Sequence, residues 1–529
     1  MPAEAPIPFG NLLETSSEEI SGACPEAYNV LADARGTLRK RPGIAAYSVA
    51  PSTAVDANGV LGLYLTEAKV AHTSGSDTVS GTHPGVLYAV GATVNASGGG
   101  HNAGRIIYRV AGGTATALTG TSNEDRLATD ALSTTRFRRP QFVETEALLV
   151  LAGGAELAKI DIRPETFSAP NFTTNASYHS VSFLDGCPPL ASHLLGNSSR
   201  ILANDTQLDQ TKVRYSDISQ GIVDFSGHES WDPSPGAGGF FTAEARPDSI
   251  AAIGENTNTI FCWGSRSLQT FSPDTSVTFA PAVTQEVGCL APYSTVKVDE
   301  QFYWVDHLTR IVSSNGQQTP KDEGGPIQET LDGYATPGDC YAYRFTDKFA
   351  DVICFRFEGD DETLAYQPGV GWCKWASYDA VSDEFGQFPV LTHLLRPDGG
   401  LNVVGLEDGT IRTLSLNNTT DLGEAIVARV RTGFVDRDTS KQKKNLGVTL
   451  TFKRTETTTS LCYLDYRDKL SDDWTEIEID LGTQDGDLTP TILLPSQGSY
   501  YRRQWRFRFP DIGDLRLVKA IEEFDVLGT

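Results

Sequence analysis

Residues 259–271 read TIFCWGSRSLQTF, in which two short apolar runs flank a small, polar turn. The first run, 259–263, and the second, 268–271, contain the β-branched and aromatic residues that favour strands. Gly264-Ser265 lies where the chain must reverse, and a glycine turn between two such runs is typical of a β-hairpin. The stretch therefore predicts two paired antiparallel strands.

Six further hairpins of this kind occur along the chain, and each has an apolar or alternating run on either side of a turn. They are 86–91 with 105–110, 147–151 with 157–162, 200–203 with 212–215, 301–305 with 309–312, 351–357 with 363–366, and 401–405 with 411–414. The seven hairpins begin about 40 to 60 residues apart, which is the range of propeller blades with insertions. The period predicts an irregular six- or seven-bladed β-propeller.

Composition agrees with an all-β fold. The chain has 529 residues, including 50 Gly and 27 Pro but a single Met. This balance suits many short strands and turns better than helices. A chain of this length would ordinarily hold roughly three or four domains, unless a closed β architecture absorbs the excess.

The pattern changes after Leu416. Residues 417–420 read as a linker, and longer alternating strands follow at 425–432, 446–453, 460–466, 474–481 and 500–509. Such strands in about a hundred residues are typical of a β-sandwich. The sequence thus predicts an N-terminal extended segment and contact arm (1–50), a propeller-like domain with long inserted loops (51–416) and a C-terminal β-sandwich (417–529).

The net charge of −25 disfavours a free-standing nucleic-acid binder, which would carry a basic patch. Residues 502–509 alternate aromatic and arginine side chains, so this strip either stacks nucleic-acid bases or is a half-buried strand. The period of two and the acidic chain favour the strand. Three basic groups are candidate contacts to acidic neighbours or simply solvated loops: Arg39-Lys40-Arg41, Arg136/Arg138-Arg139 and Lys441/Lys443-Lys444.

None of the eight cysteines forms a C-x-x-C pair, and no Cys/His cluster has zinc-ligand spacing. Most lie in apolar runs, which predicts small buried hydrophobes with reduced thiols. The acidic runs 360–362 and 485–487 are either calcium ligands or solvated turns, and neither fits the helix–loop–helix calcium pattern.

Motifs of nucleophilic, metal or phosphate chemistry do not occur in the sequence. We therefore expect no catalytic, cofactor-binding or metal-binding residues, no cofactor and no enzymatic activity. The first residues lack the features of a signal peptide, and no run of about eighteen apolar residues occurs, so we expect no membrane insertion.

An ordered series of short motifs runs through the chain. It comprises 28–30 with 36–44, Val213-Arg214-Tyr215-Ser216-Asp217-Ile218, Asp224-Phe225, 243–250, 260–263, Gly288-Cys289-Leu290-Ala291-Pro292-Tyr293-Ser294, 302–304, 326–328, and 363–366 leading into Gly371-Trp372. In this order the series resembles the tail-hub, or nozzle, proteins of short-tailed bacteriophages, also called packaged-DNA stabilisation proteins. The turn Ser471-Asp472-Asp473-Trp474 resembles an Asp-box without its glycine, where family members often carry Asp-Gly-Gly.

The resemblance implies a virion protein of the phage tail, made in the host bacterial cytoplasm. It implies a homo-oligomeric, typically hexameric ring below the portal and its adaptor, which retains packaged DNA, extends the exit channel for DNA ejection and anchors tail fibres or spikes. Double-stranded DNA would pass without sequence-specific contact.

Two alternatives stay open from the sequence. One is a receptor- or glycan-binding, or glycan-cleaving, β-propeller, since paired carboxylates leave no local signature. The other is a capsid decoration protein.

Overall fold

The computed structural model describes most of the chain, with gaps within it and at both ends. The described residues are 2–9, 24–32, 37–67, 73–74, 77–78, 85–95, 104–118, 126–128, 139–153, 156–163, 180–188, 190–197, 199–204, 209–218, 226–231, 238–243, 245–246, 248–257, 259–273, 279–348, 350–396, 400–454, 461–481 and 488–527. Two of the long inserted loops that the sequence predicts, in 72–104 and 219–240, lie partly outside these residues.

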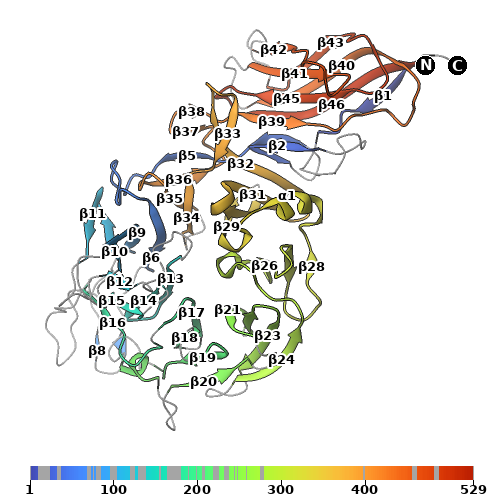
Figure 1. The fold of residues 1–529 in the computed structure, drawn as a ribbon. Coiled ribbons are helices and arrows are strands. Elements are labelled where there is room, and N and C mark those ends of the chain that lie inside the picture. The colour runs from blue at the N-terminus through green and yellow to red at the C-terminus, as the bar shows by residue number, and fades with distance from the viewer. Residues whose placement is uncertain are drawn as a thin grey trace.

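The larger part of the molecule is a ring of four-stranded antiparallel sheets, the blades (Figure 1). In chain order they are β6 (Val60–Leu65), β9 (Leu87–Asn95), β10 (Gly104–Ala111) and β11 (Thr114–Ala117), with β12 (Arg126–Ala128) beside β10; β13 (Gln141–Glu144), β14 (Leu148–Ala152), β15 (Ala158–Asp161) and β16 (Val181–Phe183); β17 (Leu194–Asn197), β18 (Arg200–Asn204), β19 (Lys212–Tyr215) and β20 (Gly239–Thr242); β21 (Ile250–Asn256), β22 (Thr259–Gly264), β23 (Leu268–Pro273) and β24 (Phe279–Gln285); β25 (Val296–Val298), β26 (Gln301–Val305), β27 (Ile311–Ser314) and β28 (Lys321–Asp322); β29 (Cys340–Asp347), β30 (Ala350–Phe357), β31 (Glu362–Gln367) and β32 (Gly371–Asp379); and β34 (Val390–Leu395), β35 (Asn402–Leu406), β36 (Ile411–Ser415) and β5 (Gly43–Ala46).

Six of these blades are separate sheets, and β29–β32 is a seventh four-stranded unit that continues into a larger sheet. First strands of neighbouring blades lie side by side around the ring, as β13 does with β17 and β34 with β6. The predicted all-β fold with an irregular six- or seven-bladed propeller is confirmed. Each of the seven predicted hairpins is the second and third strand of one blade.

Aromatic side chains join neighbouring blades. Trp263 of β22 packs edge-on against Trp304 of β26, with ring centroids 5.8 Å apart. Phe261 and Phe302 fill the space beside them at 4.8 Å, and the two tryptophans are fully buried. The apolar run that predicted a hairpin thus also supplies the contact that holds one blade on the next.

The ring is closed by a strand from the N-terminal part of the chain. β5 pairs antiparallel with β36, and Ile44 lies opposite Leu414. Residues 43–46 are therefore the fourth strand of the last blade. Gly43 fits there because a Cβ would lie 2.4 Å from the carbonyl oxygen of Thr420.

The remaining strands form a two-sheet unit beside the ring, and the labelled chain ends lie next to it (Figure 1). One sheet contains β1 (Ala3–Pro6), β3 (Val30–Ala32), β4 (Leu38–Lys40), β46 (Leu515–Val526), β40 (Lys443–Arg454), β43 (Thr491–Pro495) and β44 (Ser499–Tyr500). The other is the outer part of a ten-stranded sheet and contains β2 (Glu26–Tyr28), β39 (Ala428–Arg431), β45 (Gln504–Phe509), β41 (Leu461–Arg467) and β42 (Glu478–Asp480).

Apolar side chains of both sheets share one core. Phe452 of β40 lies 6.2 Å from Phe507 of β45, and Phe9 lies 6.1 Å from the same ring. The N-terminal strands take part in these sheets, since β1 and β4 both pair with β46. The division of the chain into an arm, a propeller and a sandwich at residues 50 and 416 stays a prediction.

A continuous sheet connects the ring with the two-sheet unit. β2 pairs parallel with β32 of the blade, where Tyr28 lies opposite Lys374, and antiparallel with β39. β33 (Glu384–Gln387) pairs antiparallel with residues 376–379 of β32. The pairing of β2 with both strands therefore joins the blade and the two-sheet unit in one sheet.

The junction cluster, Asn29, Arg41 and Asp421, holds this connection together. Asn29 adopts a positive φ of 56° and is buried. Its side chain accepts the Ala376 N–H at 2.8 Å and the Nε–H of Arg41 at 2.8 Å. The buried Arg41 guanidinium donates to both carboxylate oxygens of Asp421.

Helical structure is short, as the sequence predicts. The helical elements among the described residues are α1 (Gln328–Gly333) and the 3-10 turns η1 (Ser226–Glu229), η2 (Pro292–Ser294), η3 (Gly325–Ile327), η4 (Pro337–Asp339) and η5 (Glu358–Asp360). Two small two-stranded sheets complete the described elements, β7 (Thr73–Ser74) with β8 (Asp77–Thr78) and β37 (Thr420–Asp421) with β38 (Glu424–Ala425). No helix in the described ranges is long and apolar enough to cross a membrane.

The predicted character of the cysteines is confirmed. All eight are free, seven are buried and Cys187 is half-buried. Burial raises the pKa of the Cys289 thiol to about 12, so this group stays protonated at neutral pH.

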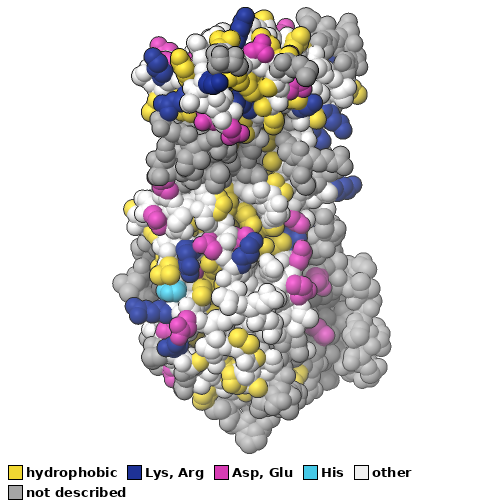
Figure 2. All heavy atoms as spheres, turned by 90° about the vertical axis from the view of Figure 1, so that its right-hand side faces the viewer, with side chains coloured by type: hydrophobic (Ala, Val, Ile, Leu, Met, Phe, Trp, Pro, Cys, Tyr) yellow, Lys and Arg dark blue, Asp and Glu magenta, His cyan; other side chains and the backbone are white. Residues whose placement is uncertain are grey.

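Charged and apolar side chains are mixed on the surface. On the face seen in Figure 2, acidic, basic and hydrophobic side chains are interspersed both over the ring and on the two-sheet unit above it.

Candidate functional site

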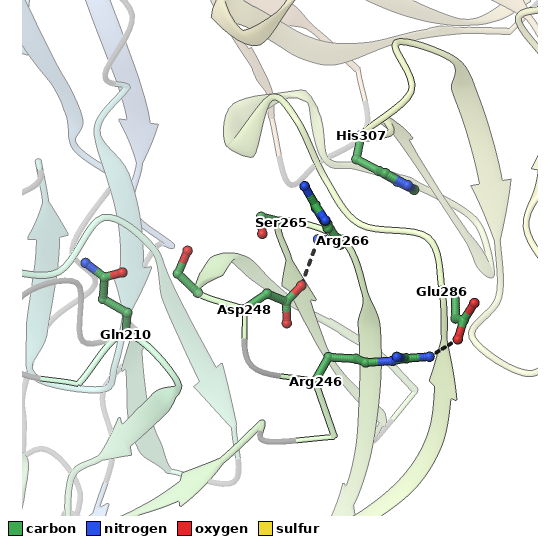
Figure 3. Close-up of a pocket in the computed structure, with 8 residues that line it drawn as sticks. Gln210, Arg246, Asp248, Ser265, Arg266, Glu286 and His307 are labelled. Carbon is green, nitrogen blue, oxygen red and sulfur yellow. Dashed lines mark hydrogen bonds and ion pairs between the residues drawn. The ribbon is translucent and has the colours of Figure 1, made fainter.

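A polar hollow of about 650 Å³ opens at one end of the propeller (Figure 3). In a propeller, the turn between a blade's second and third strands and the connection to the next blade fall at the same end of the ring. Three consecutive blades, from β17 to β28, supply such segments here. We call this hollow the end-face pocket, and its lining residues are Gln210, Arg246, Asp248, Ser249, Ser265, Arg266, Glu286 and His307.

Asp248 shapes the floor of the pocket. Its Oδ2 accepts the backbone N–H of Arg266 at 2.7 Å and that of Ser267 at 3.0 Å, and the Ser267 hydroxyl donates to Oδ1 at 3.0 Å. A Cβ on Gly264 would lie 2.4 Å from this carboxylate, so a larger residue there would push the carboxylate away from these hydrogen bonds. The carboxylate thereby fixes the β22–β23 turn, which carries Ser265 and Arg266 into the pocket.

An ion pair crosses one wall of the pocket. Arg246, from the connection before β21, pairs with Glu286, from the connection after β24. Both side chains are more than half exposed, at 51% and 75%. Such a pair is screened by water and adds little stability, but it neutralises the charge of both groups towards a ligand.

His307 lies on the β26–β27 turn, which a buried aspartate holds in place. Asp306 is fully buried, and its Oδ1 accepts the N–H groups of Leu308 and Arg310 at 2.9 Å each. Its other oxygen accepts the guanidinium of Arg310, and these hydrogen bonds raise the pKa of Arg310. The turn is therefore rigid, and it presents His307 at the rim of the pocket.

The imidazole of His307 has a defined orientation. Its Nδ1 accepts the backbone N–H of Gly288 at 3.3 Å, which in the neutral ring places the proton on Nε2. Gly288 itself packs so closely on the β22–β23 turn that a Cβ would lie 2.3 Å from the Arg266 nitrogen. These two loops are therefore held against each other, and Figure 3 shows Arg266 and His307 on the same side of the pocket.

Arg266 gives the pocket its electrostatic character. The turn residue is exposed, and among the described residues its guanidinium makes no ion pair within 4.0 Å. The other charged groups of the lining are already engaged, Arg246 with Glu286 and Asp248 with backbone N–H groups. One positive group thus remains available to a ligand.

No residue had been predicted to form a site, and this pocket was missed from the sequence. Motif 243–250 of the ordered series supplies Arg246, Asp248 and Ser249 to the lining, whereas 264–265 was predicted only as a turn. The available signal was topological, since the second-to-third-strand turns of consecutive blades must meet at one end of the ring. Which side chains point inwards depends on loop conformations that the sequence alone leaves open.

The basic groups considered as partner contacts are mostly internal. Lys40, Arg41, Arg139 and Lys443 are buried, and Arg139 pairs with Glu358. Burial lowers the pKa of Lys40 to about 7. Lys441 and Lys444 are exposed, whereas residues 136 and 138 lie outside the described residues.

The strip 502–509 is a half-buried strand. Trp505, Phe507 and Phe509 of β45 are at most 6% exposed and face the core. Arg506 and Arg508 lie on the opposite face, and both contact the buried carboxylate of Asp465 at 2.7 Å. The aromatic rings cannot stack on nucleic-acid bases because they are covered by protein.

The acidic runs give no metal centre in the part of the chain that is described. There, no group of three or more His, Cys, Asp or Glu side chains is arranged to hold a metal ion. Asp360 instead accepts the N–H groups of Ala335 and Thr336 at 2.7 and 3.2 Å. Residues 485–487 lie outside the described residues.

Comparison with known proteins gives distant structural likeness only. No protein-family model and no curated protein matches the chain. Virginiamycin B lyase from Staphylococcus aureus is 8% identical, with a TM-score of 0.36 over 67% of this chain and 99% of the lyase. The WD40 propeller domain of Doa1 is 10% identical, with a TM-score of 0.33 over 68% and 97%. Exo-β-1,3-galactanase from Phanerochaete chrysosporium is 9% identical, with a TM-score of 0.24 over 91% and 100%.

Similarities this low carry no argument about activity. The assignment of the propeller rests on the strand pairing described above.

Proposed function

We propose that this chain is a non-enzymatic structural subunit of the tail hub, or nozzle, of a short-tailed bacteriophage. In this role it forms a ring, hexameric by the family resemblance, below the portal and its adaptor. The ring retains the packaged DNA, extends the channel through which the DNA is ejected, and anchors tail fibres or spikes. The observation that carries the proposal is the continuous sheet that joins the propeller to the two-sheet unit, taken together with the ordered motifs that resemble this family.

A subunit that forms part of the wall of a DNA channel has to be stiff. Two domains joined by a linker move relative to each other by default. Here the pairing of β2 with both β32 and β39 and the buried junction cluster tie the two parts to each other. A subunit built in this way transmits load from one end to the other, which supports a place in a tube under pressure.

The two-sheet unit carries most of the exposed apolar groups. Eight of the fifteen large hydrophobic side chains that are exposed in the described residues belong to this unit, within residues 461–527. Exposed apolar surface is typical of protein contacts, and a ring requires two different complementary patches on each subunit. The eight are Leu470, Leu488, Leu493, Tyr501, Ile512, Val518, Val526 and Leu527.

Electrostatics supports passage of DNA without adhesion. The chain carries a net charge of −25, and several arginines, such as Arg41, Arg139 and Arg356, are buried inside the fold. Phosphates are repelled by a wall of the same sign.

The test is the copy number of this chain in purified virus particles, measured by quantitative mass spectrometry against the portal protein. Half as many copies as the portal supports a six-fold tail ring. Hundreds of copies would indicate a capsid decoration protein, and absence from particles would contradict any virion role.

A second candidate function, a receptor- or glycan-binding propeller, is favoured by one observation, the polar end-face pocket. A glycan-binding and hydrolysis screen separates the two candidates. Turnover of a polysaccharide would contradict the non-enzymatic assignment, whereas binding without turnover is compatible with a tail protein that touches the cell surface.

A further inference from the structure

We infer that the end-face pocket binds an acidic sugar, with the sugar carboxylate held at Arg266 and His307. The inference goes beyond the tail-ring proposal and does not depend on it, because it concerns one end of a single propeller. It gives a ligand class to the second candidate function.

The charge of the lining selects a single anionic group. Arg246 and Arg266 are balanced in number by Asp248 and Glu286, so the lining has no net charge with a neutral His307. A polyanion such as DNA or a phosphate chain would meet both carboxylates and the acidic chain around them. A monoanionic carboxylate can instead approach the one guanidinium that lacks a carboxylate partner among the described residues.

The donors suit a carboxylate. A guanidinium presents a planar fork of N–H groups that matches the two oxygens of a carboxylate. The Nε2–H of His307, fixed by the Gly288 contact at Nδ1, supplies a further donor on the same side of the pocket (Figure 3). Both groups are carried by turns that are held by buried or backbone hydrogen bonds, so little ordering is needed on binding.

The rest of the lining suits sugar hydroxyls. Gln210, Ser249 and Ser265 each carry both a donor and an acceptor, as a hydroxyl requires. A volume of about 650 Å³ lies within the range of pockets that enclose small ligands. An acidic peptide would need partners for its backbone groups, and this lining offers side chains rather than a strand edge.

Binding is to be measured by titration calorimetry of the full chain with short oligosaccharides of galacturonate, glucuronate and sialic acid. The corresponding methyl esters, which lack the charge, serve as matched ligands. At least one acid is expected to bind about tenfold or more tightly than its ester, as one charge-assisted contact implies.

Arg266→Ala is expected to remove this preference, so that acid and ester bind equally weakly. Lys297→Ala, which removes an exposed positive charge from β25 outside the lining, is expected to keep the preference unchanged. Equal thermal unfolding temperatures of the two variants and the parent chain show that a loss of binding is not a loss of fold.

Three outcomes would overturn the inference. They are equal affinity for acid and ester in the parent chain, an unchanged preference in Arg266→Ala, and binding of acidic peptides but of no sugar up to about 10 mM, where any specific contact should register. None of these outcomes bears on the copy number per particle, so the tail-ring proposal succeeds or fails separately.

Discussion

At the scale of single residues, buried polar groups organise the places where distant parts of the chain meet. Arg41 donates to Asn29, Asp421 and the carbonyl oxygen of Ala376, which lie in three separate segments of the chain. Its guanidinium also lies 4.5 Å from the ring of Phe388. This side chain therefore connects distant segments inside the fold, and its contribution to stability depends on keeping every partner in place.

Arg41→Met is expected to destabilise the protein by about 3 kcal/mol or more, since removing one member of a buried pair leaves the other charge without compensation. The measurement is the free energy of unfolding in denaturant. Lys444→Met, at an exposed position of β40, is the matched control and should change stability by less than about 0.5 kcal/mol. Equal effects of the two substitutions would contradict the role of the junction cluster.

Three buried histidines predict a loss of stability in mild acid. Burial lowers the pKa of His193, His228 and His393 from 6.5 to about 4 in each case. Between pH 6.5 and pH 4 the unfolded chain binds protons at these histidines, whereas the folded chain keeps them neutral. Their contribution to the free energy of unfolding is therefore complete above pH 6.5 and is lost as the pH drops towards 4. The unfolding temperature measured from pH 7 to pH 4.5 should decline over this window.

His393→Gln should make that decline shallower, because a group that cannot titrate no longer contributes to it. His307→Gln, at the rim of the end-face pocket, is the control for the substitution itself. A pH profile that stays flat from 7 to 4.5 in the parent chain would be incompatible with neutral buried histidines.

At the scale of elements, the sequence predicted the most buried strands and missed others. β14 is buried at all five positions and β22 at five of six, so their apolar runs are unmistakable. β24 has no buried position and was not recognised, because an outer strand presents one face to solvent. The long strand β46 was also missed, although its burial alternates along much of its length.

Long-range pairing is what local patterns cannot supply. The alternation of 502–509 correctly predicted which side chains of β45 face the core. The pairing of β5 with β36 joins residues far apart in the chain, and nothing in the four residues 43–46 indicates a partner near 413. The end-face pocket was missed for the same reason, since its residues come from three blades.

Gly43→Ala is expected to lower the free energy of unfolding by about 2 kcal/mol, because a Cβ there would overlap the backbone oxygens of Thr420 and Asn418. Neither oxygen belongs to a flexible side chain. Gly333→Ala is the matched control, since a Cβ at that position meets no atom within 4 Å. Thermal unfolding of both variants provides the comparison, and a neutral Gly43→Ala would contradict close packing at the closing strand.

At the scale of the whole molecule, the ring and the two-sheet unit depend on each other. The core cluster that contains Phe452 and Phe507 also contains Trp372 and Trp375 of β32 and Leu414 of the last blade. Strands from the first 50 residues take part in the sheets of both parts. Neither part is therefore expected to retain full stability alone.

A fragment of residues 51–416 is expected to unfold at a lower temperature than one of residues 41–416. The two fragments lack the same two-sheet unit and differ only in the segment that contains the closing strand, so the difference reports on β5. Circular dichroism during heating gives the two transitions. Identical transitions would mean that the last blade does not need its fourth strand.

The origin of the closing strand also sets the order of events during synthesis. β5 leaves the ribosome well before its partner β36, because residues 43–46 precede residues 411–415 in the chain. Until then the nascent last blade has an open edge, and such edges pair readily with strands of other chains. Where many copies are translated at once, two unfinished chains can exchange their first strands and emerge as a swapped dimer. Slow translation or low expression should therefore favour the self-closed monomer.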